Sequence, residues 1–249
     1  MTPFFLILFQ SSLKMLNWLS QNNSKVGLKM KKKNSVNLIV SLVSVFMFIL
    51  WTVALYWFDV KAIGPYNTCV GFAALNAAVH NFTGVNMTLY SVTDWLGLVP
   101  IFVAIGFALL GLIQWIKRKK LRYVDYSLFV LGAFYIVVVL LYLMFEIITV
   151  NYRPVLIDGV LEKSYPSSTT LLVVCVMSTA VMQFNVRIYD KMLRKVVSFF
   201  ISSFIVFMVI GRLFSGVHWF SDIVGGLLLS VALITMYRYA VNFKKNNKE

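Results

Sequence analysis

Six long apolar runs constrain the fold of this 249-residue chain more than any other feature. A transmembrane helix needs about 20 mostly apolar residues to cross about 30 Å of hydrocarbon. The runs that meet this requirement are 36–58, 95–116, 126–150, 168–184, 196–214 and 219–239. Backbone groups in lipid must be hydrogen-bonded within a helix or a closed barrel, and the alternating pattern of barrel strands is missing from the sequence. We therefore predict an all-α fold, a six-helix transmembrane bundle.

The distribution of basic residues predicts how this bundle is oriented. The chain has 23 Lys and Arg and a net charge of +14. In a six-span arrangement, nineteen of these residues fall in the N-terminal arm, the second and fourth connections and the tail, all on one side. An excess of this kind marks the cytoplasmic side. We expect a multi-pass protein of the cell membrane with both termini in the cytoplasm, and we expect no nucleic-acid partner, because topology accounts for the charge.

The same pattern divides the chain into three parts. Residues 1–34 form a basic cytoplasmic arm, residues 35–241 the six-span domain, and residues 242–249 a basic cytoplasmic tail. The first apolar run is too short to span and precedes its positive charge, unlike a signal peptide, and Met30 resembles a natural start. The long connection 59–94 contains several glycines, and we expect it to cover the outer end of the bundle as a lid or re-entrant segment.

Four basic residues fall on the outer side, against the general asymmetry, and so suggest a function. They are Lys61, Arg153, Lys163 and Arg212. Arg153 precedes a proline, which disfavours helix at that position. We expect an extended arm there that reaches over the bundle.

The start of the fourth apolar run has the features of a helix N-terminus. Ser167 follows a proline and is a suitable cap, with Ser168 and Thr169 next to it. Hydroxyls and free backbone N–H groups at the positive end of a helix dipole can bind an anion. A plain capped helix has the same pattern, so this segment alone does not decide between the two interpretations.

A third cluster lies between the fifth and sixth runs. His218 and Asp222 are four residues apart and would share one face of a helix, with Arg212 six residues upstream of the histidine. An acceptor on one ring nitrogen fixes the tautomer and leaves the other nitrogen free, which is typical of a nucleophile or base with an orienting carboxylate. A structural histidine at the membrane interface is the alternative.

These clusters resemble the type 2 phosphatidic acid phosphatase and vanadium haloperoxidase superfamily, over about residues 90–240. Its signature is a Lys separated by six residues from Arg-Pro, then Pro-Ser-Gly-His, then Ser-Arg, five residues, His, three residues and Asp. The third part fits Arg212, His218 and Asp222, with Gly211 in place of the serine.

The first two parts of the signature fit less closely. The Arg-Pro pair at Arg153 is kept, but Glu146 stands where the lysine belongs. The Pro-Ser pair at Ser167 is kept, but Ser168 replaces the glycine and Thr169 replaces the histidine.

The resemblance implies roles for these residues. His218 would attack phosphorus to give a phosphohistidine, and Asp222 would orient it. Arg153, Arg212 and Ser167 would bind the phosphoryl oxygens, where charge spreads in the transition state.

Three neighbouring positions complete the predicted site. Ser168 and Thr169 are counted among the phosphate-binding residues, but a hydroxyl is a poor general acid, so the proton donor of the family has no equivalent. The pattern therefore favours a diphosphate substrate, a phosphotransfer role or a weakened enzyme. We expect Glu146, as an ionisable residue within a span, to pair with Arg153 or Arg212 or to stay protonated.

The leading hypothesis is an integral membrane phosphatase that hydrolyses a lipid phosphate or diphosphate at the outer leaflet. A polyprenyl diphosphate is favoured by resemblance, and no metal or cofactor is implied. The alternative is a weakened or inactive relative that binds a lipid phosphate headgroup or scaffolds partners. A small transporter is disfavoured, because the polar residues form no path through the midplane. The oligomeric state stays open.

Overall fold

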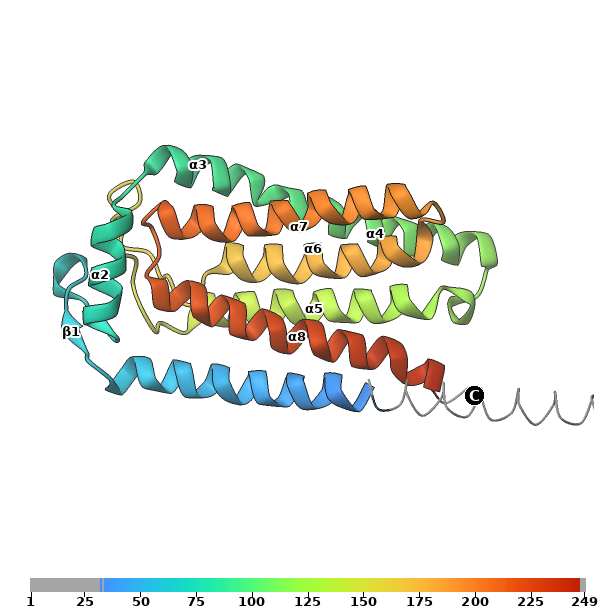
Figure 1. Ribbon diagram of the computed structural model, residues 1–249, viewed down its shortest axis with the longest axis horizontal. Coiled ribbons are helices and arrows are strands. Elements are labelled where there is room, and N and C mark those ends of the chain that lie inside the picture. Colours follow the sequence, from blue (N-terminus) through green and yellow to red (C-terminus); the bar gives the residue numbers. More distant parts are fainter. Residues whose placement is uncertain (1–31, 33, 247–249) are drawn as a thin grey trace, which may run out of the picture.

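The computed structural model describes residue 32 and residues 34–246, so most of the predicted arm, the Met30 start and the last residues of the tail lie outside the described residues. Within the described part, six helical segments are long and apolar enough to cross a membrane. They are Asn34–Trp57, α3 with α4 (Met87–Leu96 and Leu98–Arg118), α5 (Tyr126–Ile147), α6 (Ser168–Arg187), α7 (Lys191–Phe214) and α8 (Phe220–Asn246). The predicted six-span all-α fold is confirmed, and the chain is a multi-pass membrane protein (Figure 1).

The second span begins eight residues before its predicted start at position 95. The Asn86 side chain accepts a hydrogen bond from the Leu89 N–H and so caps α3. At Gly97 the chain passes from α3 to α4, and the Gly97 N–H donates to the carbonyls of Thr93 and Asp94. The polar residues of α3 lower its hydropathy, so the predicted span did not include it. In the structure α3 and α4 form one continuous membrane-spanning segment.

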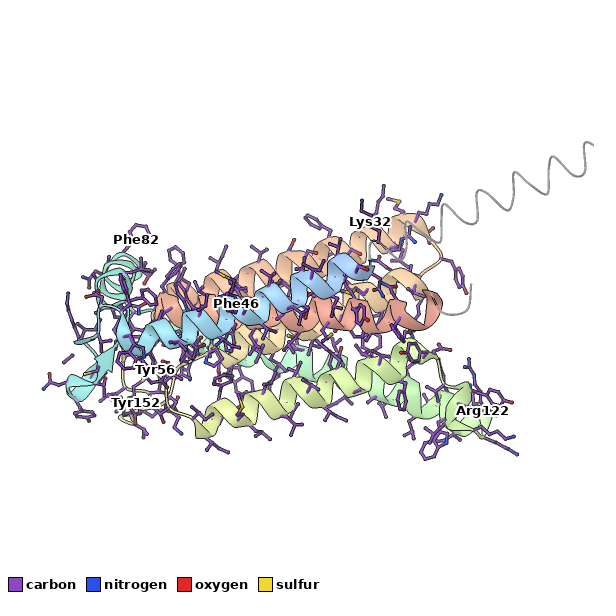
Figure 2. All side chains as sticks on the ribbon, turned by 90° about the horizontal axis from the view of Figure 1, so that it is seen from below. Lys32, Phe46, Tyr56, Phe82, Arg122 and Tyr152 are labelled. Atoms are coloured by element: carbon purple, nitrogen blue, oxygen red, sulfur yellow. The ribbon has the colours of Figure 1, made fainter. Side chains whose placement is uncertain are left out.

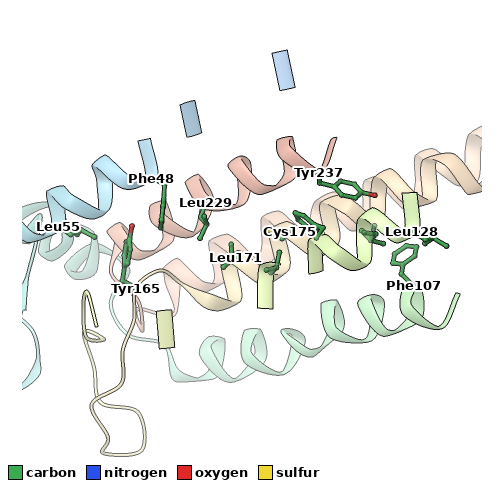
Figure 3. Packing of buried hydrophobic residues seen from close by; sticks show 13 residues of the cluster. Phe48, Leu55, Phe107, Leu128, Tyr165, Leu171, Cys175, Leu229 and Tyr237 are labelled. Carbon is green, nitrogen blue, oxygen red and sulfur yellow. The ribbon is translucent and has the colours of Figure 1, made fainter. Parts of the chain in front are cut away.

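Two helices form the centre of the bundle. Buried residues make up 56% of the apolar stretch of α6 and 61% of that of α8, against 11–22% in the other four spans. Fully buried small residues such as Cys175 and Ala180 let neighbouring helices approach α6 closely. Figure 3 shows this core, with Phe48, Tyr165 and Leu171 packed between the helices. The outer helices direct large apolar side chains such as Phe46 away from the bundle, as lipid-facing helices do (Figure 2).

Residues 59–86, which we call the lid segment, cover one end of the bundle (Figure 1). The segment contains β1 (Lys61–Ala62), a 3-10 turn (Pro65–Asn67), β2 (Cys69–Val70) and α2 (Ala73–Thr83). The two strands are antiparallel, with Lys61 opposite Val70 and Ala62 opposite Cys69. The predicted covering segment is therefore present, although its last residues, 87–94, belong to α3.

The lid segment is tied to the turn between α7 and α8. Asn76 of α2 donates to the Ser221 hydroxyl at 3.0 Å and accepts from the Ser221 N–H at 3.0 Å. The Asn86 N–H donates to the Ser215 carbonyl at 3.0 Å. Gly216 has a φ of +68° and meets the lid backbone at Gly84 so closely that a Cβ would lie 2.0 Å from the Gly84 oxygen. The lid thus fixes the backbone that precedes α8.

A short hairpin lies at the same end of the bundle, which we call the lid end. Residues 151–163 connect α5 to α6 as an extended arm, with bridges between Tyr152 and Lys163 and between Ile157 and Val160. Figure 2 shows Phe82 and Tyr152 at the lid end and Lys32 and Arg122 at the opposite end.

Candidate active site

A cavity of about 900 Å³ opens at the lid end between α4, α5, α6 and the hairpin. Its walls are apolar along the helices and polar towards the lid end. The apolar lining includes Leu98, Ile101, Val139, Leu143, Leu171 and Leu172, and the polar lining includes Asp94, Tyr142, Glu146, Arg153, Glu162, Lys163, Ser164, Ser168, Thr169, Arg212 and His218. A cavity with this division suits an amphiphilic ligand whose charged end lies at the lid end.

Two buried guanidinium groups meet at the polar end of the cavity. Arg153 comes from the hairpin and is 8% exposed, and Arg212 comes from the last turn of α7 and is 1% exposed. Both lie over the ring of Tyr90 from α3, at 5.9 Å and 5.1 Å from the ring centroid. The negative face of the ring stabilises two like charges that would otherwise repel each other.

Each arginine has an acidic partner that the sequence did not identify. Arg153 Nε lies 3.0 Å from a Glu162 carboxylate oxygen, and Arg212 Nη2 lies 3.4 Å from an Asp94 carboxylate oxygen. The expectation that Glu146 pairs with either arginine is wrong. Helix α5 ends at residue 147, three residues earlier than predicted, so Glu146 is exposed at the helix end and lies beside Tyr142.

His218 lies in the turn before α8 and is 3% exposed. We expected His218 and Asp222 to share one face of a helix, but α8 begins only after His218. Its Nδ1 lies 3.8 Å from Asp222 Oδ2, beyond hydrogen-bond distance. Asp222 instead accepts from the Trp219 N–H at 2.9 Å and from Asn151 Nδ2 at 3.2 Å. The carboxylate therefore holds the turn that carries the histidine.

The histidine ring is held neutral. Burial, and after it the charges of Arg153 and Arg212, keep the pKa of His218 well below its ordinary value. A neutral imidazole has one nitrogen without a proton, and that nitrogen can act as a nucleophile.

Several buried nitrogen atoms at this point complete no hydrogen bond with any described residue. They are Arg153 Nη1, Arg212 Nε and both ring nitrogens of His218. Buried polar groups in proteins are almost always hydrogen-bonded, and unpaired guanidinium donors beside a cavity indicate an anion ligand. The cluster therefore has the chemistry of a phosphate site.

The N-terminus of α6 adjoins this cluster. Ser167 is the N-cap, as predicted from the sequence, but its buried hydroxyl accepts from the Thr170 hydroxyl at 3.0 Å and does not line the cavity. Its N–H donates to the Asp222 carbonyl at 3.1 Å. Ser168 and Thr169 do line the cavity, at the positive end of the helix dipole. The structure thus brings together most of the predicted residues, with Ser167 and Asp222 directly behind them.

Comparison with known proteins agrees with this geometry. The family model described as the PAP2 superfamily matches residues 133–246. Among solved structures, a transmembrane PAP2-type phosphatidylglycerolphosphate phosphatase from Bacillus subtilis matches with a TM-score of 0.55 and 17% identity, over 82% of this chain and 96% of that one. At this identity the match shows a shared fold. No curated protein matches the chain.

The site extends beyond the matched PAP2 region. Arg153, Arg212 and His218 lie within it, whereas Tyr90 and Asp94 come from α3, outside it. No local motif marks these two residues, because the arginines that they contact lie in distant parts of the chain.

Proposed function

We propose that this chain is a membrane phosphatase that removes phosphate from a lipid phosphate or diphosphate, with His218 as the nucleophile. The observation that supports this most is the set of unpaired buried nitrogens on Arg153, Arg212 and His218 at the end of a cavity with apolar walls. A lipid would place its tail between the helices and its phosphate against this cluster.

The chemistry follows from the charges around His218. The free ring nitrogen attacks phosphorus, an N–P bond forms, and the P–O bond to the leaving group breaks with its electron pair. Arg153, Arg212 and the N-terminus of α6 stabilise charge on the phosphoryl oxygens. The ring becomes cationic in this step, and the Asp222 carboxylate, 3.8 Å from Nδ1, favours that charge. Water then hydrolyses the phosphohistidine.

The lack of a proton donor for the leaving group favours a diphosphate substrate. Thr169 stands where a proton donor would serve, and a hydroxyl is a poor general acid. A lipid phosphate released from a diphosphate departs without a proton, whereas an alkoxide released from a monophosphate needs one. The proposed reaction therefore converts a lipid diphosphate to a lipid monophosphate and inorganic phosphate.

A second cavity supports a long lipid chain. It measures about 440 Å³, is almost wholly apolar and lies further along α4 and α5. The α4 residues that line the two cavities recur every three or four positions, on one face of the helix. They are Leu98 and Ile101 for the first cavity and Ala104, Phe107, Ala108, Gly111, Leu112 and Trp115 for the second.

The face of α4 that lines the two cavities is longer than one leaflet of the bilayer is thick. From Leu98 to Trp115 the helix rises about 25 Å, close to the roughly 30 Å of a hydrocarbon core. An acyl chain of an ordinary phospholipid ends near the bilayer centre, whereas a polyprenyl chain reaches past it. We therefore favour a polyprenyl diphosphate as the substrate.

Filling the second cavity should reveal this chain-length preference. Gly132 lines the second cavity, and a Cβ there would meet nothing within 4 Å, so we expect Gly132→Leu to fill part of it. We expect kcat/KM to fall about tenfold for a long polyprenyl diphosphate and by less than about twofold for farnesyl diphosphate, because only the long chain loses buried methylenes. Gly106→Leu is the matched control, since Gly106 has similar space but lines neither cavity. Equal losses for both substrates in Gly132→Leu would count against the long-chain assignment.

Phosphate release by the purified protein tests the proposed function directly. Activity on a polyprenyl diphosphate well above that on phosphatidic acid would support it. The second candidate is a relative that binds a lipid phosphate without hydrolysing it, which Thr169 and Glu146 favour. Binding of inorganic phosphate with no turnover of either lipid would support this candidate instead.

We propose further that the lid end faces away from the cytoplasm. The described basic residues outside the cavity and lid gather at the opposite end, as in the loops around Arg122 (Figure 2). Cys69 is an exposed native cysteine of the lid, so the test is made in a Cys69→Ser background. There, a cysteine introduced at Val160, which is 59% exposed in the hairpin, should react with a membrane-impermeant maleimide in intact cells. A cysteine at Lys119, in the connection between α4 and α5, should react only after permeabilisation. The reverse pattern would place the site on the cytoplasmic side.

A further inference from the structure

Lys163 occupies an unusual position at the edge of the cavity. It lies on the hairpin opposite Tyr152 and lines the cavity together with Arg153 and His218. Its ammonium group donates to the carbonyls of Glu146 at 2.6 Å and Ile147 at 2.9 Å. These carbonyls end α5, where the helix dipole favours a positive charge. The long side chain is therefore anchored with its charge at the cavity wall.

The charges around the cavity distinguish Lys163 from the two arginines. Arg153 is paired with Glu162 and Arg212 with Asp94. Among the described residues that line the cavity, Lys163 is the cation without a carboxylate partner, because its contacts are neutral carbonyls. Its positive charge is therefore the least compensated one at the site.

The ammonium group also retains a donor. It has three N–H groups, and the two carbonyls occupy two of them. The side chain is only partly buried, so the third N–H is accessible from the cavity. A cation held at fixed distance from the backbone with one free donor is well suited to a phosphate oxygen.

We propose that Lys163 is a substrate-binding residue that donates to the phosphate group of the lipid from the end of α5. This inference rests on the proposed function for the identity of the substrate but not for the existence of the anion site. In this role Lys163 is the third cation at the site. Residue 146, which also lines the cavity, cannot supply that charge because it is a glutamate.

Inorganic phosphate is the probe that tests the proposal without turnover. Lys163→Gln keeps two N–H donors for the carbonyls of α5 but removes the charge. We expect its dissociation constant for phosphate, measured by titration of the melting temperature, to rise about tenfold, the loss expected for a charge-assisted hydrogen bond. Lys61→Gln is the matched control, because Lys61 lies at the same end in an exposed ion pair with Asp59 and does not line the cavity. Its dissociation constant should stay within about twofold of wild type.

A second substitution separates binding from a structural role. Adding Glu146→Lys to Lys163→Gln should restore phosphate binding to within about threefold of wild type, since position 146 lies on the same wall. A lysine there could not pin the hairpin to α5, so a structural role predicts no recovery. Phosphate affinity unchanged in Lys163→Gln, or lost without recovery in the double variant, would overturn the proposal. Wild-type protein that binds phosphate but hydrolyses no lipid would refute the proposed function and leave this inference standing.

Discussion

Replacing His218 by alanine is expected to lower phosphate release from a polyprenyl diphosphate by at least about 10⁴-fold, or about 5.5 kcal/mol of barrier. The reason is that no other described side chain at the site combines burial beside two arginines with an unprotonated nitrogen. Single-turnover phosphate release in detergent or in vesicles measures the effect. Inorganic phosphate should still bind to His218→Ala, because the arginines remain in place.

The only other histidine of the chain provides a control. His80 is in α2, its ring packs against Trp219 at 5.4 Å between centroids, and it does not line the cavity. His80→Ala removes a ring of the same size from the neighbourhood of the same turn, and we expect it to retain activity within about tenfold of wild type. Equal activity of His218→Ala and wild type would exclude a histidine nucleophile.

The membrane spans could be predicted because lipid imposes a simple requirement. A run of about 20 apolar residues must form a helix there, whatever its neighbours are. The ends of spans depend on individual hydrogen bonds, and these caused the errors. The cap at Asn86 begins α3 within a polar stretch, and α5 ends at residue 147 although the apolar run continues to position 150.

The site could be predicted only in part, for a related reason. Spacing along the chain indicated Arg153, Arg212 and His218, because each lies in a local motif. The acid that pairs with each arginine depends on how elements meet in space: Asp94 and Arg212 are 118 positions apart. The partner of Asp222 was missed for the same reason, since Asn151 belongs to a different loop. Glu146 was misassigned because its role depended on the unpredicted end of α5.

The acidic partners have a consequence for selectivity. Glu162 and Asp94 compensate the charges of the two arginines before any ligand binds. A phosphate must therefore displace or share these contacts, which weakens binding of a small anion and leaves more of the binding energy to the lipid chain. This division explains how a site with two buried arginines could release inorganic phosphate after hydrolysis.

Thr169→His is expected to give the enzyme a proton donor. Thr169 lines the cavity, and its methyl group lies next to Gly97, which has no side chain to obstruct a larger one. General acid catalysis contributes about 10²–10⁴-fold when the leaving group needs a proton. We expect activity on phosphatidic acid to rise at least about tenfold, and activity on a polyprenyl diphosphate to change by less than about threefold, since that leaving group departs as an anion. Initial rates on both lipids measure the ratio.

Two further variants show whether the effect belongs to position 169. Ser168→His places the same ring one residue earlier, also at the cavity, and should not raise activity on phosphatidic acid. Thr169→Ala should cost less than about tenfold on the diphosphate, or about 1.4 kcal/mol of barrier. A loss in Thr169→Ala as large as that in His218→Ala would contradict this account. The Thr169 hydroxyl would then be a direct phosphate ligand at the N-terminus of α6, and the diphosphate preference would need another cause than a missing proton donor.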